Sequence, residues 1–137
     1  TDMANFSAFV FQHLPDLNWA GFYLDDGASL RLGPFVGRPA CTEIAYSRGV
    51  CGAAFQRKAP LLVADVHEFP GHIACDSASR SEMVLPIVVA SQAMGVFDLD
   101  SPRAARFSEE DRAGVSLWLE AFVAAQDTST WSRRPWA

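Results

Sequence analysis

Three cysteines, Cys41, Cys51 and Cys75, are the residues of this 137-residue chain with the most evident chemistry. A thiolate is a nucleophile and a redox group, but a buried thiol is also a small hydrophobic side chain. Cys51 follows Gly49, where an Ala-rich segment is expected to begin a helix whose free N–H groups and dipole favour a thiolate. The residues alone therefore make Cys51 the first candidate nucleophile. Close helix packing around Gly52 is the alternative explanation.

Cys75 lies within residues 64–80, a polar segment long enough to suggest a functional loop. His72 is near it and could keep a thiol ionised, whereas the adjacent carboxylate of Asp76 would raise the pKa of that thiol. On spacing alone, His72 is more typical of a turn residue that forms hydrogen bonds within its own loop. The role of Cys75 stays open on these residues.

Asp98 and Asp100 are two positions apart in an expected strand, so their side chains share one face. Glu82 lies in the preceding strand of the same expected hairpin. With a two-residue loop at Ser91-Gln92, Glu82 would point to the opposite face. With a three-residue loop, Val84 would face Asp100 and Glu82 would join the acids. We predict this odd loop or an equivalent bulge.

Converging carboxylates would bind a cation, either a substrate ammonium or a metal ion. Their mutual repulsion would also raise at least one pKa and make a proton donor available. Solvent-facing acids at strand ends are the alternative. The chain has no CxxC or HxxxH pair, which weakens the case for a zinc site. Trp19, Gly21 and Tyr23 share another strand face, where the glycine would leave room for a small apolar group, although an aromatic core stripe is the commoner explanation.

The elements that must position these residues follow from hydrophobic periodicity. We expect helices over 3–14, 50–58 and from Ser108 onward, where Asp111 completes a capping pattern. We expect strands over 19–24, 30–36, 42–46, 61–63, 83–90 and 94–100. Because the clearest strand pairs are hairpins, the fold class is α+β with an antiparallel sheet. Residues 1–126 are predicted to form one domain and 127–137 a C-terminal tail.

Composition excludes several classes of function. A formal net charge of −5 disfavours nucleic acid as a partner, because binding it requires a basic surface. No apolar run approaches the roughly 18 residues that a membrane-spanning helix needs. An odd number of cysteines favours a reducing compartment over a secreted disulfide framework, so we expect a cytoplasmic protein.

Five segments, NWAGFYL, LGPFVGRPAC, GVCG, FPGHIACDSASRSE and GVFDLDS, together resemble the free methionine-(R)-sulfoxide reductases, a GAF-domain family. The cysteine separations of 10 and 24 residues fit that resemblance. It implies a GAF-like fold with about six antiparallel strands and with the N- and C-terminal helices on one face. It also implies reduction of free L-methionine (R)-sulfoxide through a cysteine sulfenic acid and an intramolecular disulfide. Thioredoxin would be the co-substrate, no cofactor would be bound, and the protein would be a homodimer.

The resemblance also assigns roles to individual residues, and it moves the nucleophile from Cys51 to Cys75. It makes Cys41 the resolving cysteine and Cys51 a third cysteine involved in recycling. The residues that it places in the substrate pocket are the carboxylates Glu82, Asp98 and Asp100 and the aromatic side chains Trp19 and Tyr23. Glu82 or Asp100 would donate the proton. A non-enzymatic GAF ligand sensor and a redox-switched binding domain are the alternatives.

Overall fold

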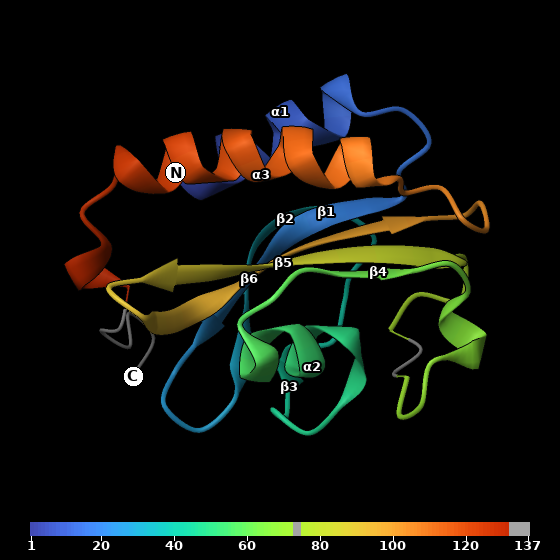
Figure 1. The fold of residues 1–137 in the computed structure, drawn as a ribbon, viewed down its shortest axis with the longest axis horizontal. Coiled ribbons are helices and arrows are strands. Elements are labelled where there is room, and N and C mark those ends of the chain that lie inside the picture. The colour runs from blue at the N-terminus through green and yellow to red at the C-terminus, as the bar shows by residue number, and fades with distance from the viewer. Residues whose placement is uncertain (73–74, 132–137) are drawn as a thin grey trace.

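The computed structural model describes residues 1–72 and 75–131 of the chain. Six antiparallel strands form one sheet in the order β3-β2-β1-β6-β5-β4 (Figure 1). The strands are β1 (Trp19–Asp25), β2 (Leu30–Gly37), β3 (Glu43–Ile44), β4 (Leu61–Val63), β5 (Ser81–Val89) and β6 (Gln92–Ser101). The helices are α1 (Asp2–His13), α2 (Gly49–Arg57) and α3 (Glu109–Ala124). The predicted α+β fold and its N- and C-terminal helices on one face are confirmed.

The sheet separates two hydrophobic cores because successive strand side chains point to opposite faces. On one face, α1 and α3 cover a core that includes Phe22, Phe97 and Leu99 (Figure 1). On the other face, α2 packs on a second core that includes Val84 and Val96. The residues with candidate chemistry belong to this second face.

Local sequence signals explain where the helices begin and end. The Ser108 hydroxyl accepts a hydrogen bond from the backbone N–H of Asp111, and the Asp111 carboxylate accepts one from the N–H of Ser108, so the predicted cap of α3 is present. Helix α1 ends before Pro15, because a proline disfavours the helical conformation in the residue that precedes it. After α3, Trp131 packs against Phe122, with 6.4 Å between the ring centroids.

The β5–β6 hairpin determines which side chains reach the site. Its turn has two residues, Ala90 and Ser91, with φ of 49° and 67°, as a tight hairpin turn of the primed type requires. A bulge at Met94 then shifts the register by one residue. The predicted bulge is therefore confirmed, and Glu82 lies on the same face as Asp98 and Asp100. The pairing that we expected for a three-residue loop was wrong by two residues, because Val84 faces Asp98 rather than Asp100 and Glu82 faces Asp100.

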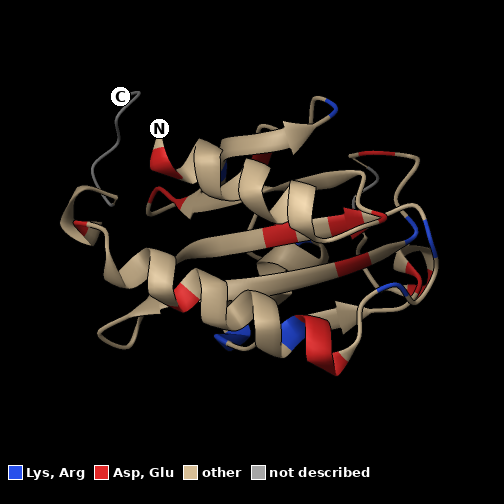
Figure 2. Ribbon diagram, turned by 90° about the horizontal axis from the view of Figure 1, so that it is seen from above, with Lys and Arg blue, Asp and Glu red and all other residues tan. Residues whose placement is uncertain are grey.

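Charged residues lie both on the surface and within the strands. Figure 2 shows acidic positions interrupting the central strands beneath the helices, whereas most basic positions lie at the periphery. In the part of the chain that the structure describes, no helix is long and apolar enough to cross a membrane.

Candidate active site

One cavity on the α2 face brings together the residues that the sequence singled out. It lies between the sheet, the beginning of α2 and the loop that carries Cys75, and its volume is about 50 Å³. The predicted residues that line it are Trp19, Tyr23, Cys51, Cys75, Glu82, Asp98 and Asp100. The remaining predicted residue, Cys41, is covalently joined to Cys75 and so lies beside the cavity.

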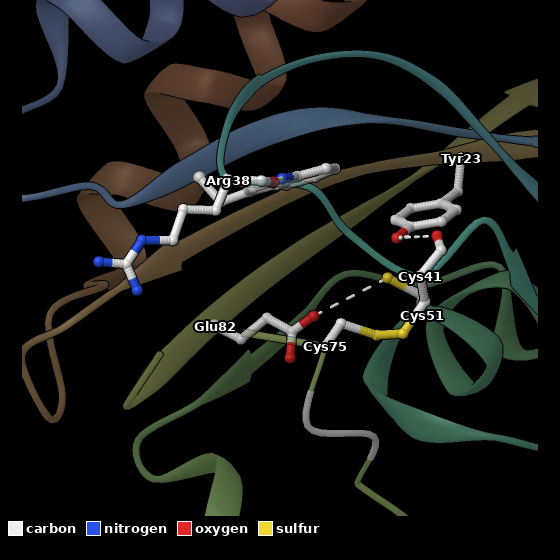
Figure 3. Close-up of a disulfide and its surroundings, with 7 residues drawn as sticks. Tyr23, Arg38, Cys41, Cys51, Cys75 and Glu82 are labelled. Atoms are coloured by element: carbon white, nitrogen blue, oxygen red, sulfur yellow. Dashed lines mark hydrogen bonds between the residues drawn. A yellow bond between two sulfur atoms is a disulfide. The ribbon is translucent and has the colours of Figure 1, made fainter. Parts of the chain in front are cut away.

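A disulfide joins Cys41 and Cys75 (Figure 3). Their Cα atoms are 5.4 Å apart, within the range that a disulfide can bridge. The bridge connects the segment after β2 to the loop before β5, two segments separated by 34 positions in the sequence. Residues 73 and 74 of the GHIACD segment lie outside the described residues. A cysteine that lines the cavity therefore has a second cysteine within bonding distance.

The three carboxylates have different proton affinities. Glu82 and Asp98 are only 7% and 5% exposed. Burial, followed by repulsion from Asp98 and Asp100, raises the pKa of Glu82 well above its usual value. Burial and repulsion from Asp98 and Asp76 do the same for Asp100. Burial raises the pKa of Asp98 only to about 6, because hydrogen bonds from Glu82 and Cys51 oppose the rise. Among these three acids the pKa of Asp98 is raised least, whereas the raised pKa values of Glu82 and Asp100 favour their protonated forms.

Asp98 is also incompletely paired. Its Oδ1 atom is buried and has no hydrogen-bond partner among the described residues. A buried carboxylate oxygen without a donor is costly, so this atom is available to a cationic ligand. The Cys51 sulfur and one carboxyl oxygen each of Glu82 and Asp98, all atoms that could bind a cation, lie within 4.8 Å of one another. The cluster can surround a single positively charged group.

Cys51 lies in the first turn of α2, as predicted, but its electrostatic environment is opposite to the expected one. The side chain is 4% exposed, and burial followed by the charges of Asp98, Glu82 and Asp100 raises the pKa of its thiol well above the usual value. This raised pKa disfavours the thiolate form of Cys51 that its place at the helix N-terminus suggested. The Cys51 Sγ instead donates to Glu82 Oε1 at 3.8 Å (Figure 3).

The aromatic wall is more tightly packed than the sequence suggested. A Cβ atom on Gly21 would lie 2.8 Å from the Trp19 ring and 2.3 Å from Phe35 Cβ, so the expected open space at this glycine is filled. The Trp19 ring stacks between Tyr23 and Phe35, with centroid distances of 5.8 and 5.3 Å. The expectation failed because Phe35, from the neighbouring strand β2, occupies the room that the glycine leaves.

Both aromatic residues of the pocket also hold the segment that carries Cys41. The Trp19 Nε1–H donates to the carbonyl of Arg38 at 3.2 Å. The Tyr23 hydroxyl donates to the carbonyl of Cys41 at 2.9 Å (Figure 3). Burial raises the pKa of Tyr23, so this hydroxyl keeps its proton. The aromatic wall is therefore also the anchor of one disulfide partner.

His72 belongs to the same loop as Cys75 and also lines the cavity. Burial and the nearby charge of His67, whose ring centroid is 6.1 Å away, lower the pKa of His72. The imidazole is therefore neutral at neutral pH and supplies no positive charge to a thiolate.

Sequence reasoning missed two residues beside the cavity, Asn18 and Ser79. The Asn18 amide donates to the Ser79 hydroxyl and to the carboxylate of Asp76. A signal for Asn18 was present: it is a polar residue directly before the buried strand β1. Nothing in the local pattern distinguished Ser79 from the other serines of its loop.

Comparison with known proteins places this arrangement in a family. Residues 8–122 match the GAF domain family. The free methionine-R-sulfoxide reductase of Escherichia coli is 52% identical over 128 residues, which cover 91% of this chain and 78% of that protein.

Two solved structures are similar throughout. The free methionine-R-sulfoxide reductase of Neisseria meningitidis in complex with its substrate has a TM-score of 0.86 and 37% identity, covering 96% of this chain and 78% of that one. The fRMsr of Staphylococcus aureus in its reduced form has a TM-score of 0.81 and 45% identity, covering 89% and 77%.

The chain belongs to the GAF-domain family, and within it to the free methionine-R-sulfoxide reductases.

Proposed function

We propose that this chain reduces free L-methionine (R)-sulfoxide to L-methionine, with Cys75 as the nucleophile and Cys41 as the resolving cysteine. One observation carries these roles: the Cys41–Cys75 disulfide lies beside a cavity that contains three carboxyl groups. The disulfide supports Cys41 and Cys75 as redox partners, whereas the order of their roles follows from the resemblance to the reductase family.

The substrate ammonium is proposed to bind Asp98. This carboxylate is the first of the three acids to ionise, and its buried Oδ1 atom lacks a partner among the described residues. The S-methyl group would lie against Trp19, next to Tyr23. A methionine within a polypeptide has no ammonium group to offer and carries flanking backbone, so a closed acidic cavity selects the free amino acid.

The chemical step transfers one oxygen atom from the substrate sulfur to the Cys75 sulfur. The Cys75 thiolate attacks the sulfoxide sulfur while Glu82 or Asp100, whose raised pKa values favour the protonated form, supplies a proton to the oxygen. The substrate sulfur gains two electrons and leaves as methionine, and Cys75 becomes a sulfenic acid. The Cys41 thiol then attacks the sulfenic sulfur, which releases water and forms the disulfide. A dithiol reductant, for which we propose thioredoxin, restores both thiols by exchange.

Cys51 is proposed to support the proton donor. Its neutral thiol donates to Glu82 Oε1 at 3.8 Å, and the Glu82 carboxyl is in turn hydrogen-bonded to Asp98, so Cys51 helps to orient the Glu82 side chain. A recycling role would instead require Cys51 to leave its buried position, where the side chain is 4% exposed.

The assembly and location of the protein are also proposals. We propose a homodimer that forms through α1 and α3, because Phe9, Leu117 and Trp118 are exposed hydrophobic residues on these helices. We propose the cytoplasm as the compartment, because a disulfide that must be reduced in every cycle needs a reducing environment.

One assay tests the proposed activity. The protein is incubated with racemic free L-methionine sulfoxide and an excess of a dithiol, and both epimers are followed by chromatography. Consumption of only the R epimer, with loss of activity in Cys75→Ser, supports the enzyme. Tight binding of a ligand without any turnover would favour the alternative, a GAF ligand sensor. The matched control is Glu110→Gln, an exposed change on α3 that removes neither a thiol nor a cavity residue.

A further inference from the structure

Asn18 lies directly before β1 and connects the sheet to the loop that carries Cys75. Its side-chain Nδ2 is 3.1 Å from Asp76 Oδ2 and 3.0 Å from Ser79 Oγ. Asp76 follows Cys75 by one position and Ser79 follows it by four. A single amide thus holds two points of the segment that begins at the cysteine.

The orientation of this amide is fixed by chemistry. A carboxylate only accepts hydrogen bonds, so the Asn18 NH₂ group must face Asp76. As a consequence, the Asn18 Oδ1 atom is buried and has no hydrogen-bond partner among the described residues. An unpaired buried acceptor is unfavourable, and the two donated bonds must outweigh that cost. The Asn18 side chain thus keeps both contacts, with Asp76 and Ser79, although its own Oδ1 atom has no partner among the described residues.

The contact continues into the cavity and toward the second cysteine. Ser79 is hydrogen-bonded to the Asp100 carboxyl, and the backbone N–H of Asn18 donates to the Asp100 carbonyl at 3.0 Å. Asp76 Oδ1 accepts from the backbone N–H of Ala78 at 2.9 Å and lies 4.0 Å from Arg38 Nη1. Arg38 precedes Cys41 by three positions. Asn18 is the central member of this network, although it does not line the cavity itself.

We propose that Asn18 is a positioning residue that holds the loop after Cys75 where the Cys75 sulfur reaches Cys41. This proposal rests on the proposed function for the identity of the two cysteines. Asn18 acts through Asp76 and Ser79 and touches neither the substrate nor a sulfur atom. Its removal therefore slows disulfide closure, while the apparent affinity for the substrate stays nearly constant.

The test measures disulfide closure in Asn18→Ala, with Asn5→Ala, an exposed change on α1, as the control. Reduced protein is mixed with one equivalent of free methionine sulfoxide, and the thiols that remain are alkylated and counted by mass. In a parallel arm, hydrogen peroxide oxidises Cys75 to the sulfenic acid and yields water, and condensation with Cys41 yields a second water. The peroxide arm reports closure even if methionine sulfoxide is not a substrate, so the two proposals can fail separately.

We expect closure in Asn18→Ala to be roughly tenfold slower or more in both arms, since hydrogen bonds to a charged group are lost. The KM for the sulfoxide should change by less than about threefold, because Asn18 does not line the cavity. Asp76→Ala should slow disulfide closure to a similar extent. The double variant should close no more slowly than either single variant, because both substitutions remove the same hydrogen bond.

Two results would overturn the proposal. One is unchanged closure in Asn18→Ala together with a lower melting temperature, which would make Asn18 a residue of the scaffold only. The other is fully additive effects of Asn18→Ala and Asp76→Ala, which would show that the two residues act independently. If Asn18→Ala does not fold, Asp76→Ala leaves β1 intact, and unchanged closure in that variant would equally refute the proposal.

Discussion

Asp98→Asn is the substitution that most directly tests the proposed binding of the substrate ammonium. The amide has nearly the same shape as the carboxylate but carries no charge. Asp98 is 5% exposed, and its pKa of about 6 leaves it ionised at neutral pH. The variant therefore removes the negative charge that is proposed to bind the ammonium, with little change in packing.

The size of the effect follows from burial. Removing one partner of a buried, hydrogen-bonded charge pair costs about 2 to 5 kcal/mol. This corresponds to a decrease of at least about 30-fold in kcat/KM. Part of this loss in kcat/KM should be recovered, because the charge of Asp98 also raises the pKa of Glu82. Without it, Glu82 loses its proton more readily and can replace Asp98 as the counterion. We therefore expect the lower end of the range, carried mainly by KM.

The assay is steady-state reduction of free methionine sulfoxide from pH 5 to pH 9, with Glu110→Gln, an exposed change on α3, as the control. In the wild type, kcat/KM should rise through about pH 6 as Asp98 ionises. That rise should disappear in Asp98→Asn. A variant whose KM stays within twofold of the wild-type value, with an unchanged pH profile, would refute the assignment of Asp98 as the ammonium receptor.

Three further predictions concern the thiols, the buried acids and the helix on the active face. Cys75→Ser should release no methionine in a single turnover, whereas Cys41→Ser should release about one equivalent; a full burst from Cys75→Ser would reassign the nucleophile. The pKa of Asp98 is raised on folding, so the unliganded protein should lose on the order of 2 kcal/mol of stability between about pH 4 and pH 6. A melting temperature that rises across that interval would contradict this sign. Gly52→Ala should destabilise the fold by about 1 to 3 kcal/mol in urea unfolding, because its Cβ would lie 2.4 Å from the Tyr46 carbonyl oxygen. Gly114→Ala, which meets no atom within 4 Å, should be neutral or stabilising.

Elements whose signals are local could be predicted from the sequence. The cap at Ser108, the proline that ends α1 and the alternating pattern of β5 and β6 fix these elements through contacts between near neighbours. The bulge was predicted for a chemical reason, since three acids in two adjacent strands are better explained on one face. Its position at Met94 was not predictable, because the turn at Ala90 and Ser91 lacks the usual glycine or asparagine.

Properties of the site that depend on distant segments were harder to predict. The thiol of Cys51 was expected to ionise because its neighbours in sequence favour a helix N-terminus. Its proton affinity is instead set by Glu82, Asp98 and Asp100, which arrive from the other side of the cavity. Phe35, which fills the space beside Gly21, belongs likewise to a different strand. The cysteine roles came only from resemblance, since no local pattern pairs Cys41 with Cys75.

The alternation of side chains along β6 has a consequence for how such a protein can change over generations. Phe97 and Leu99 stabilise the fold, whereas Asp98 and Asp100, interleaved with them, face the ligand cavity. Point mutations can therefore revise ligand preference without disturbing the core beneath α1 and α3. Deletion of one codon between Met94 and Ser101 would instead exchange the two sets of side chains and destroy both. Related sequences should therefore differ in the residue types of β6 but keep the same number of residues in this strand.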